Sequence, residues 1–296
     1  MQLIITAFAM ISCGLLLMFI SILFVPLVDN VSMEDFAKGR IDLMNHLPLL
    51  RYMQVMQSIS LFLVPAVFLA CLFEGNVVRY FNLSVASGKR WYLYISVVIL
   101  SIIPFINLLS ALNEMIVFPE SWSALENVFR TMEDAALLTT ERLMSVDSVW
   151  GLFFNLFMIA VLPALGEELI FRGILQKIFI RWTGNVHAGI IVSAFLFSAM
   201  HMQFYGIFPR WLLGVIFGYL LVWSGSIRLP VFAHFIYNAL AVVLTYLANN
   251  RKVPEELPEF GSHVDVIPIT VVLMIFGGLL LWKMKRECRL KYPTGF

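Results

Sequence analysis

Long apolar segments recur along the chain, and they limit what it can fold into. A helix needs about 20 apolar residues to cross the roughly 30 Å hydrocarbon core of a bilayer. Candidate spans cover residues 3–28, 53–73, 91–112, 149–181, 186–204, 211–223, 230–248 and 266–283. Only 13% of the residues are charged, about half the share of a typical soluble domain. The sequence therefore predicts an all-α, polytopic transmembrane helix bundle of about eight spans, counting the short segment 211–223 as a crossing.

The positions of the basic residues support this count. Lys and Arg concentrate on the cytoplasmic side of membrane proteins, and with the N-terminus inside they fall on alternate loops and in the C-terminal tail. The predicted inside residues are Arg79, Lys89, Arg90, Lys177, Arg181, Arg228, Lys283, Lys285, Arg286, Arg289 and Lys291. We expect both termini in the cytoplasm. The lack of a eukaryotic targeting signal favours a bacterial inner membrane.

One stretch between two spans is too polar to cross, yet it carries apolar residues at helical spacing. In residues 114–148 these are Val117, Leu125, Val128, Phe129, Met132, Leu137 and Leu138. We expect one or two amphipathic helices at the outer interface, and a similar arrangement for residues 33–52. The chain reads as one membrane domain: residues 1–148 hold the first spans and this outer segment, 149–248 a core, and 249–296 the last span and a basic tail.

The first unusual polar group lies in the fourth span, where the sequence reads Glu167-Glu168-Leu-Ile-Phe-Arg172 after Pro163 and Gly166. A charge inside a span costs about 2.5–3.5 kcal/mol on insertion scales and marks function by default. Proline kinks a helix, which can open a polar pocket there. Glu168 and Arg172 are four residues apart and can pair. Glu167 is about 100° round the helix, so desolvation without a partner suits it to general-base chemistry.

Two further groups follow on later spans. Phe197-Ser-Ala-Met-His201 ends in an imidazole, and His234-Phe-Ile-Tyr-Asn238 places an imidazole and an amide on one helix face. Taken singly, a buried histidine is more often a hydrogen-bonded core residue, and Ser198 at its spacing from His201 is ordinary packing. Together with Glu167, these groups supply a base, proton carriers and an amide donor. This inventory fits hydrolysis by activated water.

At these residues the sequence resembles the CAAX protease and bacteriocin-processing family of membrane proteases, also called the Abi family. That family shows Glu-Glu-x-x-x-Arg, Phe-x-x-x-His and His-x-x-x-Asn motifs in this order, each on a separate transmembrane helix. The match covers about residues 149–248 and includes Gly173, which follows the arginine. The first three spans and the last span carry no matching motif.

The resemblance implies roles for six residues. Glu167 would activate the attacking water with help from His201, and His234 and Asn238 would stabilise the oxyanion. Glu168 and Arg172 would hold the site in shape. The family has been labelled metalloprotease and also given a metal-free glutamate mechanism. No His-Glu-x-x-His signature is present, but Glu167, His201 and His234 could form a zinc site of the His₂Glu type. A zinc cofactor and a metal-free mechanism are both open at this point.

Two other classes of protein use intramembrane carboxylates and histidines. A proton-coupled transporter could use them as a relay, but transporters often repeat their broken helices in two halves, and only one such span is present here. An immunity or scaffold protein could bind a partner in the same cavity without catalysis. The expected partners are a peptide or protein substrate and the lipid bilayer. A net charge of +1 gives no indication of nucleic-acid binding, and the sequence assigns neither an oligomeric state nor a cleavage site.

Overall fold

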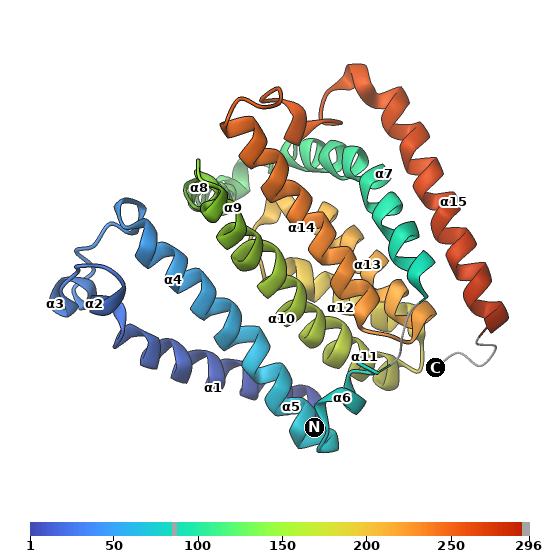
Figure 1. The fold of residues 1–296 in the computed structure, drawn as a ribbon, viewed down its shortest axis with the longest axis horizontal. Helices are drawn as coiled ribbons and strands as arrows, with labels where there is room; N and C mark the ends of the chain where they lie inside the picture. Colours follow the sequence, from blue (N-terminus) through green and yellow to red (C-terminus); the bar gives the residue numbers. More distant parts are fainter. Residues whose placement is uncertain (85–87, 292–296) are drawn as a thin grey trace.

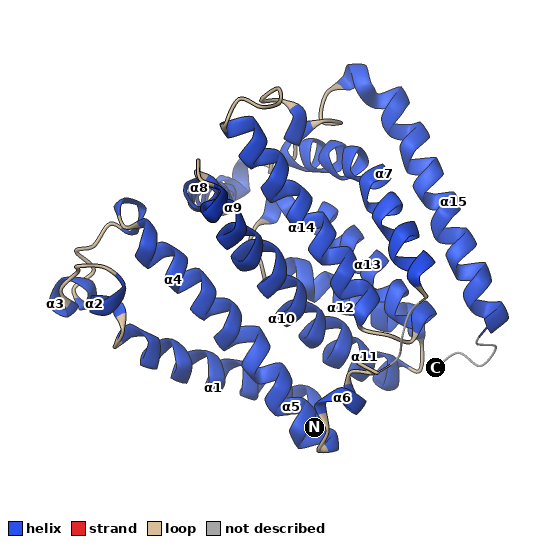
Figure 2. Ribbon diagram, in the orientation of Figure 1, coloured by secondary structure: helices blue, strands red, loops and turns tan. Residues whose placement is uncertain are grey.

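The computed structural model describes residues 1–84 and 88–291, and these are helices joined by loops, without a β-strand among the described residues (Figure 2). The predicted all-α fold is confirmed. The end of the predicted basic tail, from residue 292 onward, lies outside the described residues.

Seven helical segments of the described chain are long and apolar enough to cross a membrane. Three precede the core: α1 (Gln2–Ile22), the continuous α4–η2–α5 segment (Leu47–Ser58, Ile59–Leu63, Val64–Glu74) and α7 (Lys89–Glu114). The rest are α9 to α11 (Val149–Thr183), η6 with α13 (Phe204–Gly206, Ile207–Ser224), α14 (Arg228–Asn249) and α15 (Ile267–Lys291). The start of α1 and the end of α15 lie at the same end of the bundle (Figure 1).

The fifth predicted span differs from the observed helix. Residues 186–204 were expected to cross as one helix, but α12 (Val186–Ala199) has only 14 residues and rises about 21 Å. The predicted short span at 211–223 is instead part of the full-length η6–α13 segment. The chain turns after α12 while still inside the bundle. Because of this early turn, His201 lies among the helices and not at the surface of the membrane.

The long fourth segment, Val149–Thr183, runs without a break. It consists of α9 (Val149–Asn155), η4 (Leu156–Val161), α10 (Leu162–Ile170), η5 (Phe171–Leu175) and α11 (Gln176–Thr183). Both η4 and η5 are π-helical turns. Such turns occur often at functional sites, and here they flank α10, the helix that carries Glu167 and Glu168.

The predicted amphipathic segment folds as α8 (Ser123–Met144). In Figure 1 it is seen almost end-on, so it crosses the direction of the spanning helices at the end opposite the chain termini. Leu137 and Leu138 are 55% and 58% exposed, which suits a helix lying at a membrane surface.

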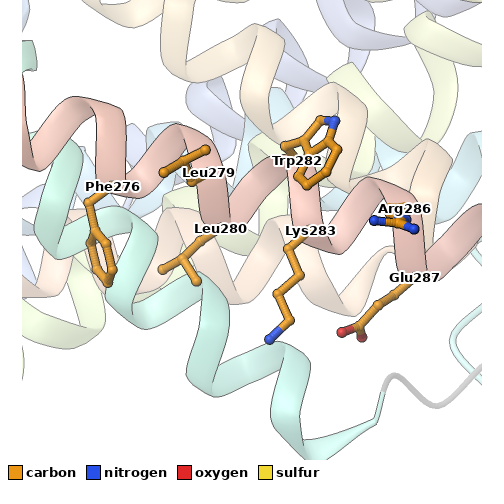
Figure 3. Close-up of a pocket in the computed structure, with 7 residues that line it drawn as sticks. All are labelled: Phe276, Leu279, Leu280, Trp282, Lys283, Arg286 and Glu287. Atoms are coloured by element: carbon orange, nitrogen blue, oxygen red, sulfur yellow. The ribbon is translucent and has the colours of Figure 1, made fainter.

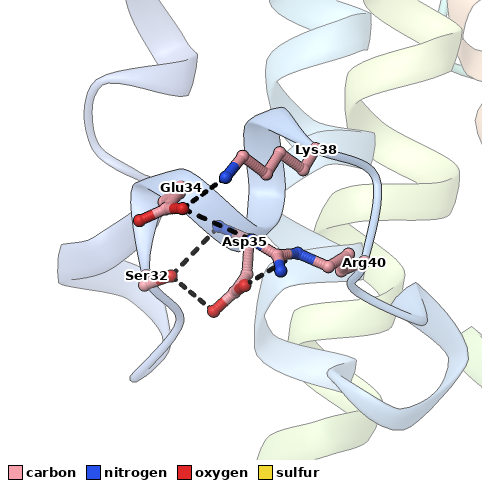
Figure 4. Close-up of polar contacts among 5 residues, drawn as sticks. All are labelled: Ser32, Glu34, Asp35, Lys38 and Arg40. Atoms are coloured by element: carbon pink, nitrogen blue, oxygen red, sulfur yellow. Dashed lines mark hydrogen bonds and ion pairs between the residues drawn. The ribbon is translucent and has the colours of Figure 1, made fainter.

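A second small cap, α3 (Met33–Ala37), follows α1 and the short α2 (Val25–Val28). The Ser32 hydroxyl accepts the Asp35 N–H at 3.0 Å and so caps this helix. Arg40 pairs with Asp35 at 3.1 Å, and Lys38 pairs with Glu34 (Figure 4). These exposed pairs stabilise the cap only slightly.

Candidate active site

Glu168 lies at the centre of a buried polar group that joins α10 to α14. Its Oε1 atom accepts hydrogen bonds from Arg172 Nη1 at 2.8 Å and from His234 Nδ1 at 2.9 Å. The expected pair between positions 168 and 172 is therefore present, and neither side chain is exposed. Because an ionised carboxylate can only accept, His234 carries a proton on Nδ1. In the neutral imidazole the Nε2 atom is then an acceptor, and it donates only when His234 is protonated.

Arg172 lies between aromatic rings. Its guanidinium carbon is 4.3 Å from the ring centroid of Phe197 and 5.5 Å from that of Phe217, and Phe217 also stacks on His234 at 5.3 Å. Gly214 leaves the space for the guanidinium, because a Cβ atom there would lie 3.1 Å from Arg172 Nη2. Arg172 Nε and Nη2 are buried without a hydrogen-bond partner among the described residues. Cation–π contacts with these rings therefore replace part of the solvation that an exposed arginine has in water.

Glu167, His201 and His234 lie around one centre. Glu167 Oε2 is 3.9 Å from His234 Nε2, which is too long for a direct hydrogen bond. The Phe197 ring contacts both imidazoles, with centroids 5.2 Å from His201 and 5.9 Å from His234. His201 Nδ1 donates to the Phe197 carbonyl oxygen at 2.9 Å, and the charges of Glu167 and His234 act on this imidazole. In their neutral forms both histidines therefore keep Nε2 as a proton acceptor.

Asn238 connects α14 to the π-helical turn η4. Its Nδ2 atom donates to the Ile159 carbonyl oxygen at 3.0 Å. An α-helical N–H at position 163 would bond this carbonyl, but Pro163 has no N–H to donate. Pro163 thus leaves the Ile159 carbonyl oxygen free to accept a hydrogen bond from Asn238. One amide N–H of Asn238 is used in this contact, and the second is left for another acceptor.

The turn that carries His201 is attached to α8. Glu133 of α8 accepts the Gln203 side-chain amide at 3.0 Å and the Tyr205 backbone N–H at 3.1 Å. The Gln203 Oε1 atom in turn accepts Arg210 Nη2 at 2.6 Å. Phe129 of α8 stacks on Phe204 with centroids 5.0 Å apart. These contacts hold the turn in place, and no signal in the sequence pointed to Glu133 or Gln203.

Glu126 lies in the first turn of α8. Hydrogen bonds from the Arg130 side chain and then from the Phe118 N–H lower the pKa of Glu126. Its carboxylate therefore stays ionised near neutral pH. The contacts of Glu126 with Arg130 and Phe118 do not depend on pH in that range.

We expect Glu133→Gln to reduce kcat of the proposed peptidase about tenfold with little change in KM. The substitution replaces charge-assisted hydrogen bonds by weaker ones, at a cost of about 1–2 kcal/mol, and so loosens the turn that carries His201. Steady-state kinetics of the reconstituted protein measure both constants. Asp134→Asn makes the same chemical change on the next, exposed residue of α8 and should leave kcat unchanged. Equal kcat values for both variants would contradict the positioning role of Glu133.

The sequence left a zinc cofactor and a metal-free mechanism both open. Within the part of the chain that the structure describes, no group of three or more His, Cys, Asp or Glu side chains is placed to hold a metal ion. His201 and His234 each use Nδ1 for a carbonyl or carboxylate oxygen and keep Nε2 for another partner, an arrangement that metal-ligating histidines also show. Ser198 donates to the Ile207 carbonyl at 2.6 Å, as expected for a structural serine.

The fold and the site define a class: a polytopic integral membrane protein with carboxylates and imidazoles gathered inside its helices. Comparison with known proteins then finds a family that part of the chain resembles. Residues 149–240 match the type II CAAX prenyl endopeptidase Rce1-like family. The expected resemblance is confirmed, and the matched segment contains all three motifs.

Curated relatives match the same part of the chain. The sporulation-killing factor biosynthesis protein SkfC of Bacillus subtilis is 35% identical over 92 residues, which cover 29% of this chain and 18% of SkfC. The uncharacterized protein YpbD of the same organism is 28% identical over 93 residues, covering 29% of this chain and 43% of YpbD. The matches thus span less than half the length of these relatives. No solved structure matches the chain.

Proposed function

We propose that this chain is an intramembrane endopeptidase that hydrolyses a peptide bond with water activated by Glu167. The observation that carries the proposal is that two adjacent carboxylates have different partners. Glu168 is paired with Arg172 at 2.8 Å, whereas Glu167 lies 3.9 Å from His234 Nε2 without a guanidinium partner. A carboxylate without a fixed counter-ion in an apolar site is a suitable general base.

In the proposed reaction Glu167 takes a proton from water while the water oxygen attacks the carbonyl carbon of the peptide bond. The carbonyl π electrons move to its oxygen and form a tetrahedral oxyanion. Glu167 then delivers the proton to the amide nitrogen, the carbon–nitrogen bond breaks, and its electron pair stays on nitrogen. The products are a new carboxyl group and a new amine, with all atoms of one water molecule accounted for.

The hydrogen bonds of the two histidines suggest different roles for them. Because the Nδ1 proton of His234 is directed at Glu168, His234 can donate to an oxyanion through Nε2 only when both ring nitrogens carry a proton. The second N–H of Asn238 is the proposed additional donor. His201, whose Nδ1 donates to a carbonyl, keeps Nε2 as the acceptor that helps to orient the attacking water.

The proposed substrate is a peptide segment of a protein that reaches the site from the bilayer. Basic residues lie at helix ends on the side of the bundle where α1 starts: α7 begins at Lys89, α11 ends just after Arg181, and α14 begins at Arg228. On the positive-inside rule this end is cytoplasmic, and we place the protein in a bacterial inner membrane with both termini inside.

The proposal is tested by cleavage of a peptide library in water enriched in ¹⁸O. The purified protein is reconstituted in lipid, and new peptide termini are identified by mass spectrometry. A peptidase produces new C-termini that carry one ¹⁸O atom, whereas a scaffold, immunity protein or transporter produces none. A lack of Glu167-dependent cleavage across libraries of soluble and membrane-anchored peptides would overturn the proposal.

A further inference from the structure

A pocket of about 580 Å³ lies between the start of α4 and the start of α9, at the end of the bundle opposite the chain termini. We call it the Arg51 pocket. Its lining includes Arg51 and Ser148, and an aromatic wall of Trp150, Phe153, Phe154 and Phe157. Trp150 and Phe153 are 83% and 59% exposed. Because α9 belongs to a membrane-spanning segment, this aromatic wall faces lipid.

Arg51 brings a positive charge into this pocket without a matching carboxylate. Its Nε and Nη2 atoms are buried and have no hydrogen-bond partner among the described residues. Its guanidinium carbon lies 5.5 Å from the Phe154 ring centroid. The charged residue that acts on it is another arginine, Arg142 at the end of α8, whose Nε donates to the Met44 carbonyl at 2.9 Å. Arg51 therefore places a positive charge at the edge of an apolar pocket.

Two other groups of basic residues in the described chain lie beside carboxylates. In the α3 cap at the same end of the bundle, Lys38 and Arg40 are both paired with carboxylates (Figure 4). A second pocket, on the far half of α15, is lined by Lys283, Arg286 and Glu287 (Figure 3). That pocket carries its own carboxylate. The Arg51 pocket differs because its lining, among the described residues, contains no carboxylate.

We propose that the Arg51 pocket binds the phosphate headgroup of an anionic phospholipid, with an acyl chain along the aromatic wall. A guanidinium matches phosphate through parallel hydrogen bonds, and no carboxylate of the described chain lines the pocket beside Arg51. Trp150 lies two residues after the N-cap Ser148, at the membrane–water boundary where tryptophan is enriched. The positive charge of Arg51 favours an anionic lipid. The proposal does not depend on the catalytic activity.

The test measures phosphatidylglycerol binding by native mass spectrometry and thermal unfolding, with the full chain in phosphatidylcholine nanodiscs. We expect added phosphatidylglycerol to raise the unfolding midpoint of the wild type. Arg51→Gln should weaken this binding about tenfold, as expected for the loss of a charge-assisted contact. Arg286→Gln, which removes an arginine from the α15 pocket, is the matched control and should retain the effect.

Three outcomes decide the proposal. Loss of the lipid effect in Arg51→Gln but not in Arg286→Gln supports it, and equal responses of both variants overturn it. Stabilisation of the wild type by inorganic phosphate alone, to the same extent as by phosphatidylglycerol, overturns the assignment to lipid. If Arg51→Gln does not fold, Trp150→Ala tests the same pocket through an exposed residue, and unchanged lipid affinity in that variant counts against the proposal.

Discussion

Replacement of Glu167 by glutamine is expected to lower kcat about 10²–10⁴-fold, the usual contribution of a general acid or base. Glutamine has nearly the same shape as glutamate but cannot take a proton from water. Its neighbours His234 and Arg172 keep their contacts with Glu168, so the fold and KM should change little. Cleavage of a peptide identified in the ¹⁸O experiment, followed under single-turnover conditions, measures this loss directly.

Two controls separate chemistry from structure in this experiment. Glu141→Gln makes the same change at an exposed carboxylate of α8 and should leave kcat unaltered. The thermal midpoint of Glu167→Gln should match that of the wild type. A Glu167→Gln protein that folds normally and cleaves at the wild-type rate would show that another group activates the water.

The spans and the three motifs could be predicted because both are local properties of the sequence. Hydropathy over about 20 residues marks a crossing helix, and an i, i+4 spacing is enough to predict the Glu168–Arg172 pair. The length of α12 could not be predicted in this way. Residues 200–204 are apolar enough to continue a span, but the backbone leaves the helix there, with Met202 at φ +55°, and tertiary contacts hold the turn.

The surroundings of the site depend on contacts between distant parts of the chain. Phe217 stacks on His234 from another helix, and Glu133 holds Gln203 across 70 positions of sequence. A single sequence shows Phe217 as one apolar residue among many and Glu133 as an ordinary charge on an amphipathic helix. Only the structure shows that a Cβ atom at Gly214 would lie 3.1 Å from Arg172 Nη2.

The second large effect is expected from the buried pair. Glu168→Gln leaves the guanidinium of Arg172, which is 0% exposed, without a counter-charge, and breaking a buried pair from one side typically costs about 3–5 kcal/mol. Arg172→Met leaves Glu168 uncompensated and should cost a similar amount. The double variant Glu168→Gln/Arg172→Met removes both charges, so most of the lost stability should return. Unfolding by sodium dodecyl sulfate in mixed micelles measures the free energy of unfolding of all three variants.

Activity should not recover together with stability in the double variant, because the loss of the Glu168 charge also weakens the hydrogen bond that orients His234 through its Nδ1 atom. We therefore expect a folded protein with a strongly reduced kcat. The exposed pair of Lys38 and Glu34 has the same i, i+4 spacing, and Glu34→Gln should leave both stability and kcat unchanged. If the double variant were less stable than either single variant, the cost would come from lost packing around Arg172 and not from an unpaired charge.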